Sequence, residues 1–236
     1  MSEKVTMSGL DTQIDFSTVL ASSVHDMKNS VGMLLSSVEN IMEEYKDKIE
    51  TENSDFRTLH YEASRINGEL IQLLSLYRMD NGFMPVNIDE YFVMDVFEDQ
   101  VARNQMLLDA SGIEVEFDLP ENLVWYFDTD LIGGVLHNIL VNCIRYTKSK
   151  IRLSAEKIDK TLIISISDDG PGYPKDMLDN PVNRVECAEV SKGNTHLGLF
   201  FAQNIASLHK EGERRGSIHL SNGGDLGGGV FTLSLP

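Results

Sequence analysis

A histidine next to a carboxylate, His25-Asp26, is the first group in this sequence that could act as a nucleophile. A neighbouring carboxylate can hold one nitrogen of an imidazole ring and make the other nitrogen more nucleophilic. Asn29 follows one helical turn later, on the same face of a predicted helix. Taken alone, this cluster is better interpreted as a polar, solvent-facing helix surface, so its function depends on what accompanies it.

Two asparagines spaced four residues apart, Asn138 and Asn142, place both side-chain amides on one face of a second predicted helix. Amide oxygens suit a hard cation such as Mg²⁺, which keeps several waters and bridges to phosphate groups. Asparagine is a poor helix former, so two on one face invite an explanation, although a polar helix edge bonded to a loop is the alternative. Arg145 and Tyr146 follow at the end of this helix.

Two glycine-containing segments could shape a pocket. In Asp168-Asp169-Gly170-Pro171-Gly172, an acidic residue ends an apolar strand, and the glycines then let the backbone approach a ligand. Asp168 could accept a hydrogen bond from an exocyclic amine, although a simple turn is the better interpretation of this segment alone. The segment Thr195-His196-Leu197-Gly198-Leu199 opens a helix, and the N–H groups at a helix N-terminus are a ready phosphate site.

Charge limits the classes of partner. The 236 residues include 20 Lys and Arg against 37 Asp and Glu, which gives a net charge of −17. A nucleic-acid backbone and an anionic membrane both require a basic surface, so we expect neither as a partner. Residues 145–160 are a local exception, with six basic side chains against two acidic ones. Of these six we expect Arg145 alone to reach an anionic ligand, because alternation along a strand turns half of the side chains away.

Two helices with a heptad pattern must position His25. Their apolar residues follow alternating steps of three and four, and the polar segment 46–55 between them is typical of a hairpin turn. Asn81-Gly82 and then Pro85 end the second helix. The first seam consists of Leu20, Val24, Met27, Val31, Leu34, Val38, Ile41 and Tyr45, and the second of Phe56, Leu59, Ala63, Ile66, Leu70, Leu73 and Tyr77.

Two helices with such narrow seams bury little apolar surface by themselves. We therefore expect residues ~15–80 to form a homodimer in which two hairpins make a four-helix bundle. The alternative is that the hairpin packs against the rest of the same chain.

From residue 86 the pattern changes to alternating helices and strands. This pattern predicts an α/β sandwich with helices on one face of a mixed sheet, and a domain boundary near residues 81–86. Helices are expected at 89–108, 130–146 and 197–209, and strands at 113–119, 123–126, 150–156, 162–168, 217–220 and 230–235. A loop-rich segment is expected at 170–195 and a glycine-rich hairpin loop at 223–229.

Other features exclude further classes. No apolar run approaches the ~20 residues of a membrane span. Residues 1–10 lack the basic start and apolar block of a signal peptide. Cys143 and Cys187 allow at most one disulfide. We therefore expect a soluble, cytoplasmic protein without membrane insertion.

Taken together and in this order, the clusters resemble the boxes of the two-component histidine protein kinases. Residues 25–29 resemble the H-box of that family, 138–147 its N-box, 168–172 its G1 box and 195–199 its G2 box. Each box is a weak signal alone, but four in the family's order, with a heptad hairpin carrying the first, are a strong one. The resemblance covers nearly the whole chain from about residue 15.

The resemblance implies a dimerisation and phosphotransfer hairpin at 1–85 and a GHKL-type ATP-binding catalytic domain at 86–236. It implies that His25 accepts a phosphoryl group from ATP and that Asp26 is the general base. Asn29 would orient water when the kinase dephosphorylates its response-regulator partner. We therefore predict a soluble histidine kinase that autophosphorylates His25, phosphorylates an aspartate of a receiver domain, and also acts as a phosphatase of that regulator.

The same resemblance implies roles in an ATP site. Asn142, helped by Asn138, would ligate Mg²⁺. The other implied cofactor residues are Arg145 at the phosphates, Tyr146 beside the adenine, Asp168 at the adenine amine, Gly170 and Gly172 in the pocket wall, and Thr195, Leu197, Gly198 and Leu199 at the lid-side phosphates.

Three positions depart from the family pattern. Ser30 replaces a usual proline, His196 a usual glycine and Cys143 a usual alanine. No sensor segment is recognisable, so we expect the signal to come from a separate sensor protein, from a soluble ligand, or from nothing. Two other functions stay open at this point: a histidine phosphotransfer protein with a degenerate ATP domain, and a non-catalytic dimeric adaptor that binds another kinase through its heptads.

Overall fold

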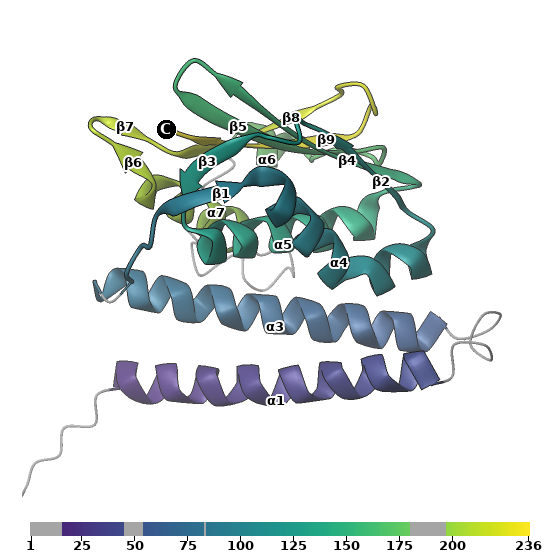
Figure 1. Ribbon diagram of the computed structural model, residues 1–236. Helices are drawn as coiled ribbons and strands as arrows, with labels where there is room; N and C mark the ends of the chain where they lie inside the picture. The colour runs from purple at the N-terminus through teal and green to yellow at the C-terminus, as the bar shows by residue number, and fades with distance from the viewer. Residues whose placement is uncertain (1–15, 45–53, 83, 180–196) are drawn as a thin grey trace, which may run out of the picture.

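A pair of long helices lies beside an α/β layer structure in the computed structural model, which describes residues 16–44, 54–82, 84–179 and 197–236 (Figure 1). The two helices are α1 (Phe16–Glu44) and α3 (Ser54–Asp80), and they pack side by side. Both heptad segments are therefore helical, as predicted. Most of the predicted hairpin turn between them lies outside the described residues.

Some residues of the heptad seams are buried, and others are exposed to solvent. Val24 and Val38 of α1 and Ala63 of α3 are buried. A second set of seam residues, spaced seven apart on each helix, keeps 39–56% of its surface exposed. This exposed heptad stripe consists of Met27, Leu34 and Ile41 on α1, and Leu59, Ile66 and Leu73 on α3.

A five-stranded mixed sheet forms the base of the α/β part. Its strands follow the order β2-β4-β5-β9-β8, in which the β2–β4 pair is parallel and the other described pairs are antiparallel. Along β5, alternate residues are buried and the others half-exposed, as a strand with one covered face requires. The strands are β2 (Glu114–Asp118), β4 (Lys150–Ile158), β5 (Thr161–Asp168), β8 (Ser217–Asn222) and β9 (Gly229–Leu235).

Three helices, α4 (Val93–Ser111), α5 (Thr129–Tyr146) and α7 (Leu197–Leu208), cover one face of this sheet (Figure 1). Their side chains join those of the sheet in one core, with Phe97, Leu136 and Ile205 almost fully buried. The predicted α/β sandwich with helices on one face of a mixed sheet is confirmed. In the described part of the chain, no helix is both long and apolar enough to cross a membrane.

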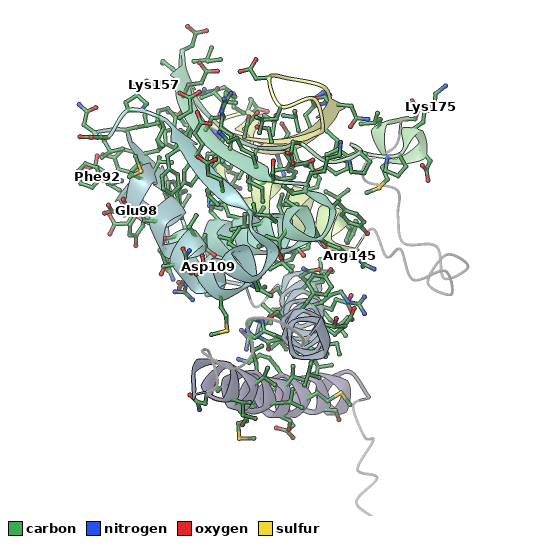
Figure 2. The ribbon with its side chains drawn as sticks, turned by 90° about the vertical axis from the view of Figure 1, so that its right-hand side faces the viewer. Phe92, Glu98, Asp109, Arg145, Lys157 and Lys175 are labelled. Atoms are coloured by element: carbon green, nitrogen blue, oxygen red, sulfur yellow. The ribbon has the colours of Figure 1, made fainter. Side chains whose placement is uncertain are left out.

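The helix α3 lies between α1 and these three helices (Figures 1 and 2). It contacts α4, α5 and α7 on one side and α1 on the other. The alternative expectation, that the hairpin packs against the rest of the same chain, therefore holds for α3. The exposed heptad stripe is left uncovered by this packing.

Three short elements differ from the prediction. The helix expected from residue 89 begins only at Val93, because Asp89–Phe92 forms the strand β1, antiparallel to β3 (Val124–Phe127). Tyr91 packs on Phe127 with ring centroids 5.7 Å apart, and such aromatic cross-strand pairs favour a strand over a helix. The predicted loop contains a short helix, α6 (Lys175–Asp179), and an unpredicted small hairpin is formed by β6 (Lys210–Glu211) and β7 (Arg214–Arg215).

A buried histidine fixes the start of α5. The Nε2 atom of His209 accepts a hydrogen bond from the backbone N–H of Asp128 at 3.0 Å, while Nδ1 lies 2.9 Å from the carbonyl oxygen of Ile205. A carbonyl only accepts, so Nδ1 carries the proton and the ring is neutral. Burial lowers the pKa of His209, although the bond to Ile205 and the Asp128 carboxylate act in the opposite direction. Asp128 in turn caps α5, accepting from Leu131 N at 3.0 Å.

We expect acid to destabilise the fold partly through His209. The unfolded chain binds a proton at the ordinary histidine pKa near 6.5, whereas the folded ring resists protonation until lower pH, so the free energy of unfolding falls as pH drops below about 6.5. His209→Gln keeps a side-chain acceptor without titrating, and should weaken this pH dependence in urea unfolding between about pH 5 and 7. The exposed His219→Gln is the control, and equal slopes for the two variants would contradict the prediction.

Candidate functional site

One cavity of about 360 Å³ lies where α3 faces α5, the loop after β5 and the start of α7. It collects most of the residues that the sequence predicts for a nucleotide site. These are Asn138, Asn142, Arg145 and Tyr146 from α5, Asp168 from the end of β5, Gly172 from the following loop, and Gly198 and Leu199 from α7. Five further lining residues come from α3: Ser64, Arg65, Gly68, Glu69 and Gln72.

Asp168 is buried at the base of this cavity, with 6% of its surface exposed. Its Oδ1 atom accepts hydrogen bonds from Gly170 N at 2.7 Å and from Gly229 N at 3.2 Å. Its backbone carbonyl accepts from Gly228 N at 3.0 Å. None of these bonds uses Oδ2, so this oxygen is available to accept a hydrogen bond from a ligand.

Close approaches of neighbouring backbone or side-chain atoms explain three of the glycines in or beside the cavity wall. A Cβ atom on Gly170 would lie 2.5 Å from the carbonyl oxygen of Tyr146, and one on Gly228 only 2.4 Å from that of Asp168. A Cβ on Gly198 would lie 2.5 Å from Nδ2 of Asn138. Gly170 is absent from the lining but shapes the wall in this way, because only glycine permits these contacts.

Asp169, which the sequence analysis quoted without a role, ties the loop to the end of α5. Its carboxylate accepts from Lys148 N at 2.8 Å, from Ser149 N at 3.0 Å and from the Ser149 hydroxyl at 2.6 Å. Desolvation raises the pKa of Asp169, but these hydrogen bonds outweigh it and hold the pKa well below its usual range. The carboxylate is therefore ionised when it fixes the loop.

Asn138 is held between two elements. Its Oδ1 atom accepts a hydrogen bond from Nε2 of Gln72 on α3 at 2.7 Å, and Gln72 is only 3% exposed. Its Nδ2 atom is buried and has no hydrogen-bond partner among the described residues. A buried, unpaired donor beside the glycine of a helix N-terminus fits an oxygen-rich ligand such as a phosphate.

Arg145 also contacts α3. Its guanidinium carbon lies 5.6 Å from the ring centroid of Tyr61 and 5.4 Å from that of Tyr146, within the range of cation–π contacts. Sequence reasoning missed Tyr61 and Gln72. The available signal was their spacing in the sequence. Tyr61 and Gln72 are eleven residues apart, so on a helix they share a face with Arg65 and Gly68, on the side of α3 away from the heptad seam.

The other basic residues after Arg145 serve the sheet rather than the cavity. Lys150 and Arg152 each approach Glu116 at 3.4 Å, and Arg152 also binds Asp225 at 2.8 Å. Lys157 lies over the ring of Trp125 at 5.4 Å. In the described part of the chain, Arg145 is the one member of the predicted basic stretch that lines the cavity.

His25 lies outside this cavity, on α1. Its Nδ1 atom is 3.5 Å from Oδ1 of Asp26 and 3.4 Å from Nδ2 of Asn29. The His25 side chain is 52% exposed, and both contacts are made by Nδ1. The structure therefore brings together the three predicted residues of this cluster but separates them from the cavity by α3 (Figure 2).

One of the four residues that the resemblance assigns to the lid-side phosphates lies outside the described residues. Thr195, together with the unusual His196, lies outside the described residues. Leu197 begins α7. Gly198 and Leu199 line the cavity.

The protein donors at this cavity suit Mg²⁺ better than a transition metal. Within the described residues, no group of three or more His, Cys, Asp or Glu side chains could hold a metal ion. The amide oxygens of Asn138 and Asn142 are hard ligands, and Mg²⁺ is commonly held by few protein oxygens together with substrate phosphates. The residues present therefore fit a nucleotide with its magnesium ion.

Comparison with sequence families matches residues 127–236 to the family described as "Histidine kinase-, DNA gyrase B-, and HSP90-like ATPase". The chain is 27% identical over 223 residues to the sensor histidine kinase CssS of Bacillus subtilis. The aligned region covers 93% of this chain and 46% of that protein. It is 25% identical over 224 residues to the sensor protein SrrB of Staphylococcus aureus, covering 92% of this chain and 37% of that protein. The chain thus spans less than half the length of these relatives.

Solved structures share the fold. The histidine kinase AdeS of Acinetobacter baumannii superposes with a TM-score of 0.58 at 23% identity, over 89% of this chain and 96% of that one. Full-length ShkA in complex with AMPPNP superposes with a TM-score of 0.62 at 16% identity, over 93% of this chain and 46% of that one.

We expect Gly170→Ala to weaken nucleotide binding without unfolding the chain. The added methyl group would displace the loop from Tyr146 and Asp168, and misplacing a binding group by about 1 Å can cost on the order of 100-fold. Isothermal titration with ATP and Mg²⁺ measures the effect. Gly134→Ala on α5 is the matched control, because a Cβ there meets nothing within 4 Å and should stabilise the helix by about 0.5–1 kcal/mol. Equal affinities for the two variants would contradict the prediction.

Proposed function

We propose that this chain is a two-component histidine kinase and that it transfers the γ-phosphoryl group of ATP to His25. The match of residues 127–236 to the ATPase family and the likeness to sensor histidine kinases support this proposal. One observation carries this proposal. Residues from α5, β5 and α7, far apart in sequence, meet around one cavity, in which the acceptor Asp168 is buried and Gly172, Gly198 and Gly229 form part of the wall.

The residues of the cavity divide between the two ends of ATP. Oδ2 of Asp168 accepts a hydrogen bond from the adenine amine, and Tyr146 lies beside the base. Arg145 and the N–H groups at the start of α7 face the phosphates. Asn142 and Asn138 offer amide oxygens to Mg²⁺. Bound Mg²⁺ supplies neutralisation of the charge that develops on the phosphate oxygens.

His25 is the acceptor in this proposal. Asp26 acts as general base at Nδ1, the nitrogen that it approaches, which leaves Nε2 as the nucleophile. A bond forms between Nε2 and the γ-phosphorus while the bond from phosphorus to the bridging oxygen breaks, and ADP leaves. Asn29, which also lies against Nδ1, orients water when the regulator is dephosphorylated.

The phosphoryl group then passes to an aspartate of a response-regulator receiver domain, with ATP and Mg²⁺ as the cofactors. The alternative functions, a phosphotransfer protein with a degenerate ATP domain and a non-catalytic adaptor, gain no specific support. Most of the predicted nucleotide residues line the cavity, and His196 lies outside the described residues.

Phosphoryl transfer requires the α/β part to move away from the observed position. His25 is absent from the cavity lining, and α3 lies between α1 and the α/β part (Figure 2). Gln72 also donates to the Asn138 oxygen that Mg²⁺ would use. Release of Gln72 and rotation about the segment at 81–85, where Gly82 has a φ of +69°, would free both Asn138 and the path to His25.

A homodimer is part of this proposal. The exposed heptad stripe runs along both helices at intervals of seven, as a surface that packs against a second pair of helices requires. The two hairpins would form a four-helix bundle, with residues 1–85 as the dimerisation unit and 86–236 as the catalytic unit.

We expect His25→Gln to abolish phosphorylation, because glutamine has no ring nitrogen to attack phosphorus. Wild-type protein incubated with radiolabelled ATP and Mg²⁺ should acquire acid-labile label, and the variant none. His219→Gln, which removes an exposed histidine of β8, should be labelled like the wild type. Acid-labile label that persists in His25→Gln would disprove the assignment.

We expect Ile66→Glu to shift the protein toward monomers, since it places a charge in the centre of the exposed heptad stripe. Burying that charge should cost about 3 kcal/mol, or roughly 100-fold in the dimer dissociation constant. Sedimentation velocity measures the effect. The matched control is Ile158→Glu on β4, because the two side chains are 42% and 50% exposed and only Ile66 belongs to the stripe. A wild type that is monomeric at micromolar concentrations would contradict the proposal.

A further inference from the structure

A tyrosine that the sequence analysis did not assign, Tyr173, lines the cavity beside Asp168. It follows the glycines of the loop after β5. A Cβ atom on Gly229 would lie 3.0 Å from Cε2 of Tyr173 and 2.9 Å from Oδ2 of Asp168. The edge of the tyrosine ring and the unused oxygen of Asp168 therefore converge on the same small part of the cavity wall.

The backbone of Tyr173 is fixed by a side chain outside the cavity. Its N–H donates to Oδ1 of Asn222 at 2.7 Å, and its carbonyl accepts from Nδ2 of Asn222 at 2.8 Å. Asn222 is the last residue of β8 and pairs with Gly229 on β9. The two hydrogen bonds to one amide hold the peptide groups on both sides of the Tyr173 Cα atom, and so fix the position and orientation of this residue.

Gly172 makes room for the Asn222 side chain that forms these two hydrogen bonds. Its φ is +81°, a conformation that favours glycine, and a Cβ there would lie 2.7 Å from Oδ1 of Asn222. The chain therefore turns directly against the Asn222 amide just before Tyr173. Gly172 and Tyr173 therefore line the cavity, and Asn222 holds them from outside it.

The Tyr173 side chain is partly buried against the core, near the Asp168 carboxylate. Burial raises its pKa, and the neighbouring Cys143 thiol and Asp168 carboxylate raise it further. The hydroxyl therefore stays protonated and can donate a hydrogen bond. Asp168, which acts only as an acceptor when ionised, presents the complementary group at the same place.

We propose that Tyr173 reads the base of the bound nucleotide together with Asp168, and that Asn222 is the residue that positions it. This inference rests on the proposed function. Adenine presents an amine donor next to a ring-nitrogen acceptor on its Watson–Crick edge. Asp168 would accept from the amine and Tyr173 would donate to the ring nitrogen. Guanine presents a carbonyl acceptor next to an N–H donor, which reverses both polarities and leaves buried polar groups unpaired.

Tyr173→Phe tests the donor role, because it keeps the ring and removes only the hydroxyl. We expect ATP affinity, measured by titration calorimetry at constant Mg²⁺, to fall by about tenfold and the preference for ATP over GTP to narrow by a similar factor. Binding of inorganic tripolyphosphate should stay unchanged, because that probe has no base. Tyr126→Phe is the control, since Tyr126 is 60% exposed on β3, interacts with Glu90 and does not line the cavity.

Asn222→Ala tests the positioning role. It should reproduce the loss of ATP affinity, leave tripolyphosphate binding intact, and add little when combined with Tyr173→Phe, because both changes disable one unit. Asn204→Ala, which removes an amide bonded to the Phe200 carbonyl within α7, is the control.

The outcomes separate the inference from the function on which it rests. A wild type that binds ATP, with Tyr173→Phe equal to it in ATP and GTP affinity, overturns base reading while the proposed kinase function stands. Equal loss of ATP and tripolyphosphate in Asn222→Ala shows a general structural role and overturns positioning. A wild type that binds no nucleotide overturns both the proposed function and the inference.

Discussion

The hydrogen bonds around the Asp168-Asp169 dipeptide are the constraint on which the cavity depends. Asp168 receives N–H groups from its own loop and from the start of β9, and Asp169 receives those at the start of β4. Two carboxylates thus join three strands and the end of α5 at one point. Because these hydrogen bonds are made within the protein, the loop is shaped before any ligand enters, and a ligand does not have to order it.

A protein with a net charge of −17 needs a local means of attracting an anionic nucleotide. The basic stretch after Arg145 does not supply it, because Lys150 and Arg152 are paired with Glu116 and Asp225. Arg65 at the cavity is likewise paired, with Glu62 at 2.7 Å and Glu69 at 3.3 Å. Attraction therefore depends on Arg145, on backbone and amide N–H donors, and on the cation that a nucleotide carries with it. These are short-range, directional interactions, which select for shape more than for charge.

Much of this architecture could be predicted from the sequence. Heptads and alternating apolar runs identified the long helices and all five strands of the main sheet, because each pattern reports one covered face. The sequence could not reveal β1, whose partner β3 is more than 30 residues away. For Gln72 and Tyr61 the sequence indicated only a shared face of α3. The roles of these two residues and of Asn222 depend on contacts across 66, 84 and 49 positions, which no local pattern encodes. The order and type of the residues were enough to predict a set of nucleotide-binding residues. Which of these residues instead contact α3 depends on packing, which no local pattern encodes.

The same oxygen of Asn138 links the two halves of the molecule. In the observed arrangement it accepts from Gln72, and in the proposed nucleotide complex it would face Mg²⁺. A cation and an N–H donor compete for the same lone pairs, so tighter docking of α3 must weaken nucleotide binding, and bound nucleotide must weaken docking by the same factor. Arg145 reinforces this coupling, since Tyr61 and the phosphates would draw on one guanidinium. In the proposed mechanism, the hydrogen bond from Gln72 to Asn138, which helps to hold α3 beside the cavity, is therefore also one that nucleotide binding would break on the way to His25.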